Sequence, residues 1–178
     1  MVVAIERPGT DEYAPYYGGY IDRVPAGDII AILGGQIGEL KSLLGNLTDE
    51  QGDFRFAPGE WTIKEVVGHL VDTERAFGYR AFAFSRNDSS PMPGIEQDDY
   101  VREGNFGARS LADLREELAL LRGANLLAYR YLTAEISQRR GVASGMAISV
   151  RALLYTLAGH IIYHEEDLRE QYLPGLAA

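Results

Sequence analysis

The chain has 178 residues, a formal net charge of −9 and no cysteine. This length suits one domain, residues 1–178, that buries enough surface to fold without disulfides or a metal ion. The missing cysteines exclude thiolate metal sites and a cysteine nucleophile, and the acidic balance argues against nucleic-acid binding, which depends largely on Lys and Arg.

The N-terminal residues lack a basic region followed by an apolar run, and no stretch of the chain is apolar for long enough to span a bilayer. The expected location is therefore the cytoplasm, with no membrane contact. Residues 1–24 combine clustered tyrosines with prolines and a Gly-Gly pair, which is typical of irregular structure. We expect a strap packed on the outside of the domain; the alternative is that Tyr13, Tyr16 or Tyr17 lines the mouth of a pocket.

The first two predicted helices follow this segment. Apolar residues recur at helical spacing from about residue 28 to a Gly-Asn stop signal at residues 45–46. Thr62 and Glu65 then form a capping-box pattern, from which a second helix is expected to run to about Arg86. Trp61, just before this helix, is interpreted as a structural plug at one end of the domain.

Residues 87–109 have no helical pattern and are rich in proline and glycine. Long ordered loops in compact domains are often functional. Ser110 can then cap a third helix over about residues 111–136, and residues 139–145 read as a loop. Ser149 can cap a fourth helix over about residues 150–172, ended by Pro174 and Gly175. The pattern predicts an all-α four-helix bundle with an irregular N-terminal strap, a long loop between the second and third helices, and no sheet of consequence.

The three histidines of the chain all lie on apolar faces of predicted helices. His160 and His164 are four residues apart, so their side chains lie one above the other on the fourth helix. His69 occupies the corresponding face of the second helix, together with Val66 and Leu70. A single inward histidine is usually a core residue satisfied by hydrogen bonds. Three of them favour a site for one divalent metal ion, zinc or nickel, with an open coordination position.

Asp72, three residues after His69, can orient an imidazole or act as a general base; the alternative is a solvated acid. Position 161 is isoleucine, so the glutamate of the H-E-x-x-H zincin motif is absent. Any general base must therefore come from Asp72, from Glu165, from the acidic residues of the loop, or from bound water.

Three segments, APGEWTIKEVVGHLVDTE (57–74), PMPGIEQDDYV (91–101) and AGHIIYHEEDLREQYL (158–173), resemble the DinB-like (YfiT-like) superfamily of metalloenzymes. The resemblance covers about Ala57 to Leu173. It implies a four-helix bundle whose helix order is not simple up-down-up-down, a divalent metal ion on His69, His160 and His164, and frequent dimers. Many relatives carry a further histidine where this chain has Tyr163, a position at the edge of the histidine face, so we expect the ligand set to be intact.

In the resembled family a segment like 91–101 lies near the entrance of the site. Gln97 and Tyr100 are therefore candidates for substrate contacts, and the alternative is a solvated turn. The link between the second and third helices is also long enough for a crossover along the bundle.

Three neutral imidazoles leave the charge of a bound ion available to activate water or polarise an oxygen. The first functional hypothesis is metal-dependent hydrolysis of a small molecule. The alternative is transfer involving a low-molecular-weight thiol, as in the bacillithiol transferases of the resembled superfamily. A third possibility, from a different class, is a non-catalytic metal-binding stress protein.

Apolar residues also lie on the opposite faces of the second and fourth helices. An element with two apolar faces is covered on both sides. The strap is expected to cover one, and a second subunit the other, which predicts a homodimer. The residues concerned are Val67, Val71, Phe82, Tyr155 and Ile162.

Overall fold

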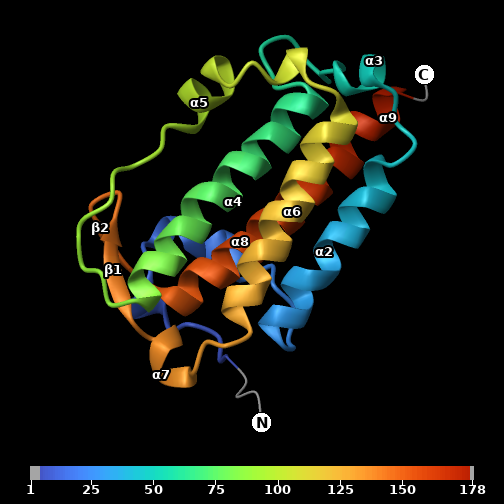
Figure 1. Cartoon of the computed structure of the whole chain (residues 1–178). Coiled ribbons are helices and arrows are strands. Elements are labelled where there is room, and N and C mark those ends of the chain that lie inside the picture. Colours follow the sequence, from blue (N-terminus) through green and yellow to red (C-terminus); the bar gives the residue numbers. More distant parts are fainter. Residues whose placement is uncertain (1–4, 177–178) are drawn as a thin grey trace.

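Four long helices form the bundle in the computed structural model, which describes residues 5–176 (Figure 1). They are α2 (Ile29–Leu44), α4 (Ile63–Ser85), α6 (Leu111–Tyr129) and α8 (Val150–Asp167). Each begins at a capping residue whose side chain accepts a backbone hydrogen bond: Asp28, Thr62, Ser110 and Ser149. At Thr62 the complete capping box with Glu65 is present, so the start of this helix is confirmed.

The helix order differs from a simple up-down-up-down arrangement. Both α2 and α4 pack against α6 and against α8, so α2 and α4, although consecutive in the chain, lie at opposite corners. Figure 1 shows that α4 and α6 run in the same direction, because residues 86–110 return along the whole length of the bundle. The crossover expected for this segment is therefore confirmed.

Two parts predicted as loops contain regular structure. Residues 87–109 include the short helix α5 (Gln97–Glu103) and the 3-10 turn η3 (Phe106–Ala108). Residues 140–149 form an antiparallel hairpin, β1 (Arg140–Ala143) and β2 (Met146–Ser149). Its two turn residues, Ser144 and Gly145, have φ values of 53° and 75°, as a tight two-residue hairpin turn requires.

The predicted ends of the last two bundle helices were wrong. The third helix stops at Tyr129, because the chain turns there and Thr133 caps a separate short helix, α7 (Ala134–Ser137). The fourth helix continues as a π-helical turn, η4 (Leu168–Tyr172), and then as α9 (Leu173–Leu176). Pro174 and Gly175 thus lie inside the last turn and do not end the helix at residue 172.

The N-terminal strap is ordered and packs on the bundle, although its residues 1–4 lie outside the described part of the chain. It comprises η1 (Thr10–Glu12), η2 (Pro15–Tyr17) and α1 (Gly18–Ile21), and α1 lies directly on α8. A Cβ atom at Gly159 of α8 would collide with the backbone carbonyl oxygen of Tyr20, so this close approach requires glycine. Arg151 of α8 binds the buried carboxylate of Glu12, which fixes the strap at its other end.

The side chains that suggested a subunit interface are mostly covered within the chain. Val67 and Val71 belong to a core cluster with Val101 and Phe106 of the returning segment. Tyr155 is buried in the other core cluster, beside residues of the strap. These residues therefore carry no argument for a dimer, although Phe82 is 52% exposed. Within residues 5–176, no helix is both long and apolar enough to cross a membrane.

Candidate metal centre

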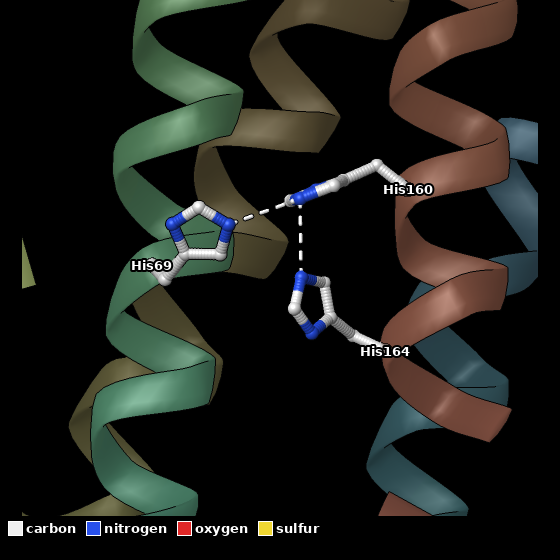
Figure 2. Close-up of side chains that lie close together, drawn as sticks. All are labelled: His69, His160 and His164. Carbon is white, nitrogen blue, oxygen red and sulfur yellow. Dashed lines mark hydrogen bonds between the residues drawn. The ribbon is translucent and has the colours of Figure 1, made fainter. Parts of the chain in front are cut away.

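The three histidines converge between α4 and α8. Nε2 of His160 lies 3.0 Å from Nε2 of His69 and 3.1 Å from Nε2 of His164 (Figure 2). His69 comes from α4, whereas His160 and His164 are one turn apart on the antiparallel helix α8. All three are buried, and their ligand atoms lie within 4.8 Å of one another.

Hydrogen bonds among the imidazoles do not satisfy this arrangement. A neutral imidazole nitrogen is either a donor or an acceptor with one lone pair, so Nε2 of His160 cannot pair properly with both neighbours. Nδ1 of His164 is also buried without a hydrogen-bond partner. A cation at the point of convergence would satisfy all three Nε2 atoms. The two separations that involve His160, 3.0 and 3.1 Å, are close to the roughly 3.3 Å that tetrahedral Zn–N bonds of 2.0–2.1 Å imply. The donor set therefore fits a divalent transition metal ion.

Burial keeps the histidines uncharged, which leaves their lone pairs free for a metal ion. Desolvation lowers the pKa of His69 to about 4. Desolvation, followed by the neighbouring His69, lowers that of His164 to about 3. The pKa of His160 also lies well below its ordinary value, through burial and then through the other two histidines and Arg122.

Aromatic rings enclose the histidines. The ring of Trp61 lies 4.9 Å from that of His69, so this residue belongs to the site and is more than a plug at the end of the bundle. Tyr20 of the strap places its ring 5.2 Å from His160. Tyr163 packs edge-on against His164 and Tyr20, is 38% exposed, and is not part of the ligand cluster.

A cavity opens from the histidines along α4. The volume open to the centres of water-sized groups is about 100 Å³. His69, His160 and Asp72 line it, together with Gln97 and Tyr100 of α5. Burial raises the pKa of Asp72. No hydrogen bond joins Asp72 to a histidine among the described residues, so Asp72 faces the cavity space without orienting an imidazole.

A second cavity adjoins His164. Its wall includes His164, Trp61 and Tyr163, and three residues, Tyr16, Tyr20 and Gln97, line both cavities. The strap therefore forms part of the site. The alternative prediction, that tyrosines of the strap line a pocket, is confirmed for Tyr16 and Tyr17. Tyr13 packs against the apolar core instead.

Glu165, the other candidate base, points elsewhere. Burial, and then the nearby Glu39 of α2, raise its pKa to about 7, and its Oε1 atom has no hydrogen-bond partner. Neither of the two cavities at the histidines includes it among the described lining residues. Its buried carboxyl group therefore lies on the α2 side of α8, away from both cavities.

Sequence reasoning missed several of the lining residues, among them Arg80 and Tyr20. Arg80 follows His69 at position i+11, so the helical period of α4 places it on the histidine face. That signal was present in the sequence. Tyr20 left no comparable signal, because its place beside His160 depends on the path of the strap.

Comparison with known proteins agrees with this architecture. A family model described as the DinB superfamily matches residues 33–168. The chain therefore belongs to the DinB superfamily. A similar solved structure is that of YfiT from Bacillus subtilis, described as a probable metal-dependent hydrolase with an unusual four-helix bundle topology. It is 20% identical with a TM-score of 0.69, over 89% of this chain and 93% of that one. No curated protein matches the chain significantly.

Proposed function

We propose that the protein is a metal-dependent enzyme that hydrolyses a small molecule. The observation that carries the proposal is the convergence of three buried, neutral imidazole nitrogens, two of which belong to residues that line a cavity. The description of YfiT as a probable metal-dependent hydrolase supports the same class of reaction. Zinc or nickel is the expected ion, because imidazole suits both.

The residues of the chain have distinct proposed roles. His69, His160 and His164 would hold the ion, which supplies Lewis-acid polarisation and lowers the pKa of water when bound. Asp72 lines the same cavity and can accept a proton there. Gln97 and Tyr100, exposed on α5 at the cavity wall, would contact the substrate. Tyr20 and Trp61 shield the imidazoles from bulk water.

The first test measures metal content after exhaustive dialysis. Wild-type protein and the Tyr163→Phe control should retain one zinc or nickel ion per chain, whereas His164→Ala should retain none. The second test compares hydrolysis of p-nitrophenyl esters and simple amides before and after chelation and metal return. Stoichiometric metal in the His164→Ala protein would reject the site. A protein that binds metal but turns over neither these substrates nor a thiol with an aryl halide would favour the third possibility, a non-catalytic metal-binding protein.

The second cavity favours one alternative, a transferase that uses a low-molecular-weight thiol. Such a reaction needs room for two partners, and two cavities adjoin the histidines, one lined by His69 and His160 and the other by His164. The nucleophile would arrive with the cosubstrate, so the absence of cysteine is no obstacle. Metal-loaded protein that consumes an aryl halide only when a small thiol is added, and that hydrolyses no ester, would establish this alternative.

We also propose that the protein forms a homodimer. This proposal rests on exposed apolar side chains of α4 and α6, and not on the helix faces that are buried within the chain. Tyr79 and Phe82 of α4 are 60% and 52% exposed, and Leu120, Leu127 and Tyr131 at α6 and its end are exposed too. Tyr79 and Phe82 are neighbours, with ring centroids 6.5 Å apart, and a contiguous exposed apolar patch is typical of an interaction surface. Light scattering at micromolar concentration should give the mass of two chains, and Phe82→Glu should lower it.

A further inference from the structure

The cavity beside the histidines contains a buried cation with no carboxylate partner. Arg80 is only 4% exposed and lines the same cavity as His69 and His160. Among residues 5–176, no salt bridge involves Arg80, although the other fully or nearly buried arginine, Arg122, is paired with Glu74. A buried charge is costly when it is unpaired, so the position of Arg80 calls for an explanation.

The polar neighbours of Arg80 leave part of the guanidinium group unused. One Nη2 hydrogen bond goes to the carbonyl oxygen of Pro93, at 2.8 Å. The hydroxyl group of Tyr17 lies next to it, and the ring of Phe77 lies beneath it at 5.0 Å from Cζ. A guanidinium group has five N–H donors in a planar fork. The remaining donors are therefore free for a ligand that enters the cavity.

The order of the lining residues along α4 indicates how such a ligand would lie in the cavity. His69, Thr73, Phe77 and Arg80 lie on one face of the helix and all line the cavity. The Arg80 side chain folds back over Phe77, which is eight residues, about 12 Å along the helix axis, from His69. Tyr17 and Ile95 provide further apolar wall between the two ends. Apart from the histidines, Asp72 and Arg80 are the charged residues of this lining.

We propose that Arg80 binds the carboxylate group of the substrate, and that the substrate is a small organic acid with an apolar segment between this carboxylate and the group that reacts at the histidines. Arg80 forms charge-assisted hydrogen bonds to the anion, in the fork geometry that suits a carboxylate. Phe77 and Tyr17 contact the apolar segment. The identity of the ligand as a substrate rests on the proposed function, whereas anion binding at Arg80 does not.

A structural role for Arg80, as an anchor for the loop through Pro93, makes a different prediction. An anchor needs only a hydrogen-bond donor, whereas an anion site needs the positive charge. Arg80→Gln keeps an amide donor near Pro93 and removes the charge. Arg80→Lys keeps the charge and removes the fork. Arg86→Met is the matched control, because Arg86 is an exposed arginine just beyond the end of the same helix, outside the cavity.

The experiment measures binding of phenylacetate and of its neutral analogue phenylacetamide by calorimetry, with the full-length protein loaded with metal and again after chelation. Wild type and Arg86→Met should bind phenylacetate at least about tenfold more tightly than phenylacetamide, as expected for hydrogen bonds to a charged group. Arg80→Gln should lose this preference, and Arg80→Lys should keep part of it. Circular dichroism verifies that each variant is folded.

Three results would overturn the proposal: a folded Arg80→Gln protein that keeps the preference, equal binding of acid and amide by wild type, or binding that disappears on chelation yet survives in Arg80→Gln. Inorganic phosphate that binds where phenylacetate does not would also reject a carboxylate ligand. The metal content measured in parallel separates the two hypotheses. A protein that takes up no metal ion when metal is supplied, yet binds phenylacetate through Arg80, rejects the proposed function and keeps the anion site.

Discussion

Arg122 of α6 and Glu74 of α4 form an ion pair in the centre of the bundle, with both side chains essentially inaccessible to solvent. Nε and Nη2 of the arginine donate to the same carboxylate oxygen, at 3.0 and 2.8 Å. Nη1 donates to Gln36 of α2, whose own amide donates to the carbonyl oxygen of Ala158 in α8. One hydrogen-bond network thus connects all four helices. It reaches α8 at Ala158, two residues before His160.

Removal of one partner of this pair should be strongly destabilising. Glu74→Leu leaves the Arg122 charge buried and unpaired, which typically costs about 3–5 kcal/mol. The double variant with Arg122→Met should be more stable than Glu74→Leu alone. Glu117→Gln, which disrupts partly exposed pairs with Arg75 and Arg109, is the control and should cost about 1 kcal/mol or less. Urea unfolding curves measure all four proteins; equal costs at Glu74 and Glu117 would contradict this account.

Metal removal should lower stability without unfolding the protein. Neither of the two apolar core clusters includes any of the three histidines. At a thousandfold excess of metal over its Kd, chelation should reduce the free energy of unfolding by about 4 kcal/mol. Thermal melts with and without a chelator measure the effect. A chelated protein that loses its helical circular dichroism at room temperature would show that the fold depends on the metal.

The single tryptophan should report metal binding. Trp61 lies with its ring 4.9 Å from that of His69, and the chain contains no other tryptophan. Addition of copper or nickel to the metal-free protein should therefore quench its fluorescence with a one-to-one endpoint. His164→Ala should abolish this endpoint, whereas Tyr163→Phe should preserve it. Quenching that is unchanged in His164→Ala would place the ion elsewhere.

Substitution of two glycines by alanine should have opposite effects. Gly159→Ala introduces a Cβ atom that collides with the backbone of Tyr20, so α1 must move away from α8 at a cost of about 1–3 kcal/mol. A Cβ atom at Gly38 of α2 meets nothing within 4 Å, so Gly38→Ala should stabilise by up to about 1 kcal/mol. Thermal unfolding distinguishes the two. A neutral Gly159→Ala would mean that the strap is not held where it lies.

Acid should weaken the attachment of the strap. Burial alone would raise the pKa of Glu12, but hydrogen bonds from Arg151 and from the backbone of Gly9 lower it to about 2. Because this value is below the unfolded value of 4.5, Glu12 contributes stability above pH 4.5 that is lost as the pH falls towards 2. The stability difference between wild type and Glu12→Gln should shrink over this interval. A difference that stays constant from pH 6 to pH 3 would contradict this assignment.

The sequence was sufficient for features that depend on local pattern. Helical periodicity and capping residues predicted the four bundle helices. The same periodicity predicted that all three histidines face the interior of the bundle. It was insufficient where distant segments decide the outcome. Val67, Val71 and Tyr155 were assigned to an outer face because the segments that cover them could not be positioned. The hairpin at residues 140–149 is short, and its strands pack on the bundle through contacts such as that between Gly141 and Phe84.

The separation of the ligands along the chain sets an order of events during synthesis. His69 and His160 are 91 residues apart, and the intervening crossover must be in position before their helices can meet. Contacts at such sequence separation form slowly, because a long loop has to close first. A nascent chain that has not yet produced α8 holds only one of the three imidazoles. The three imidazoles therefore come together only when the last helix docks.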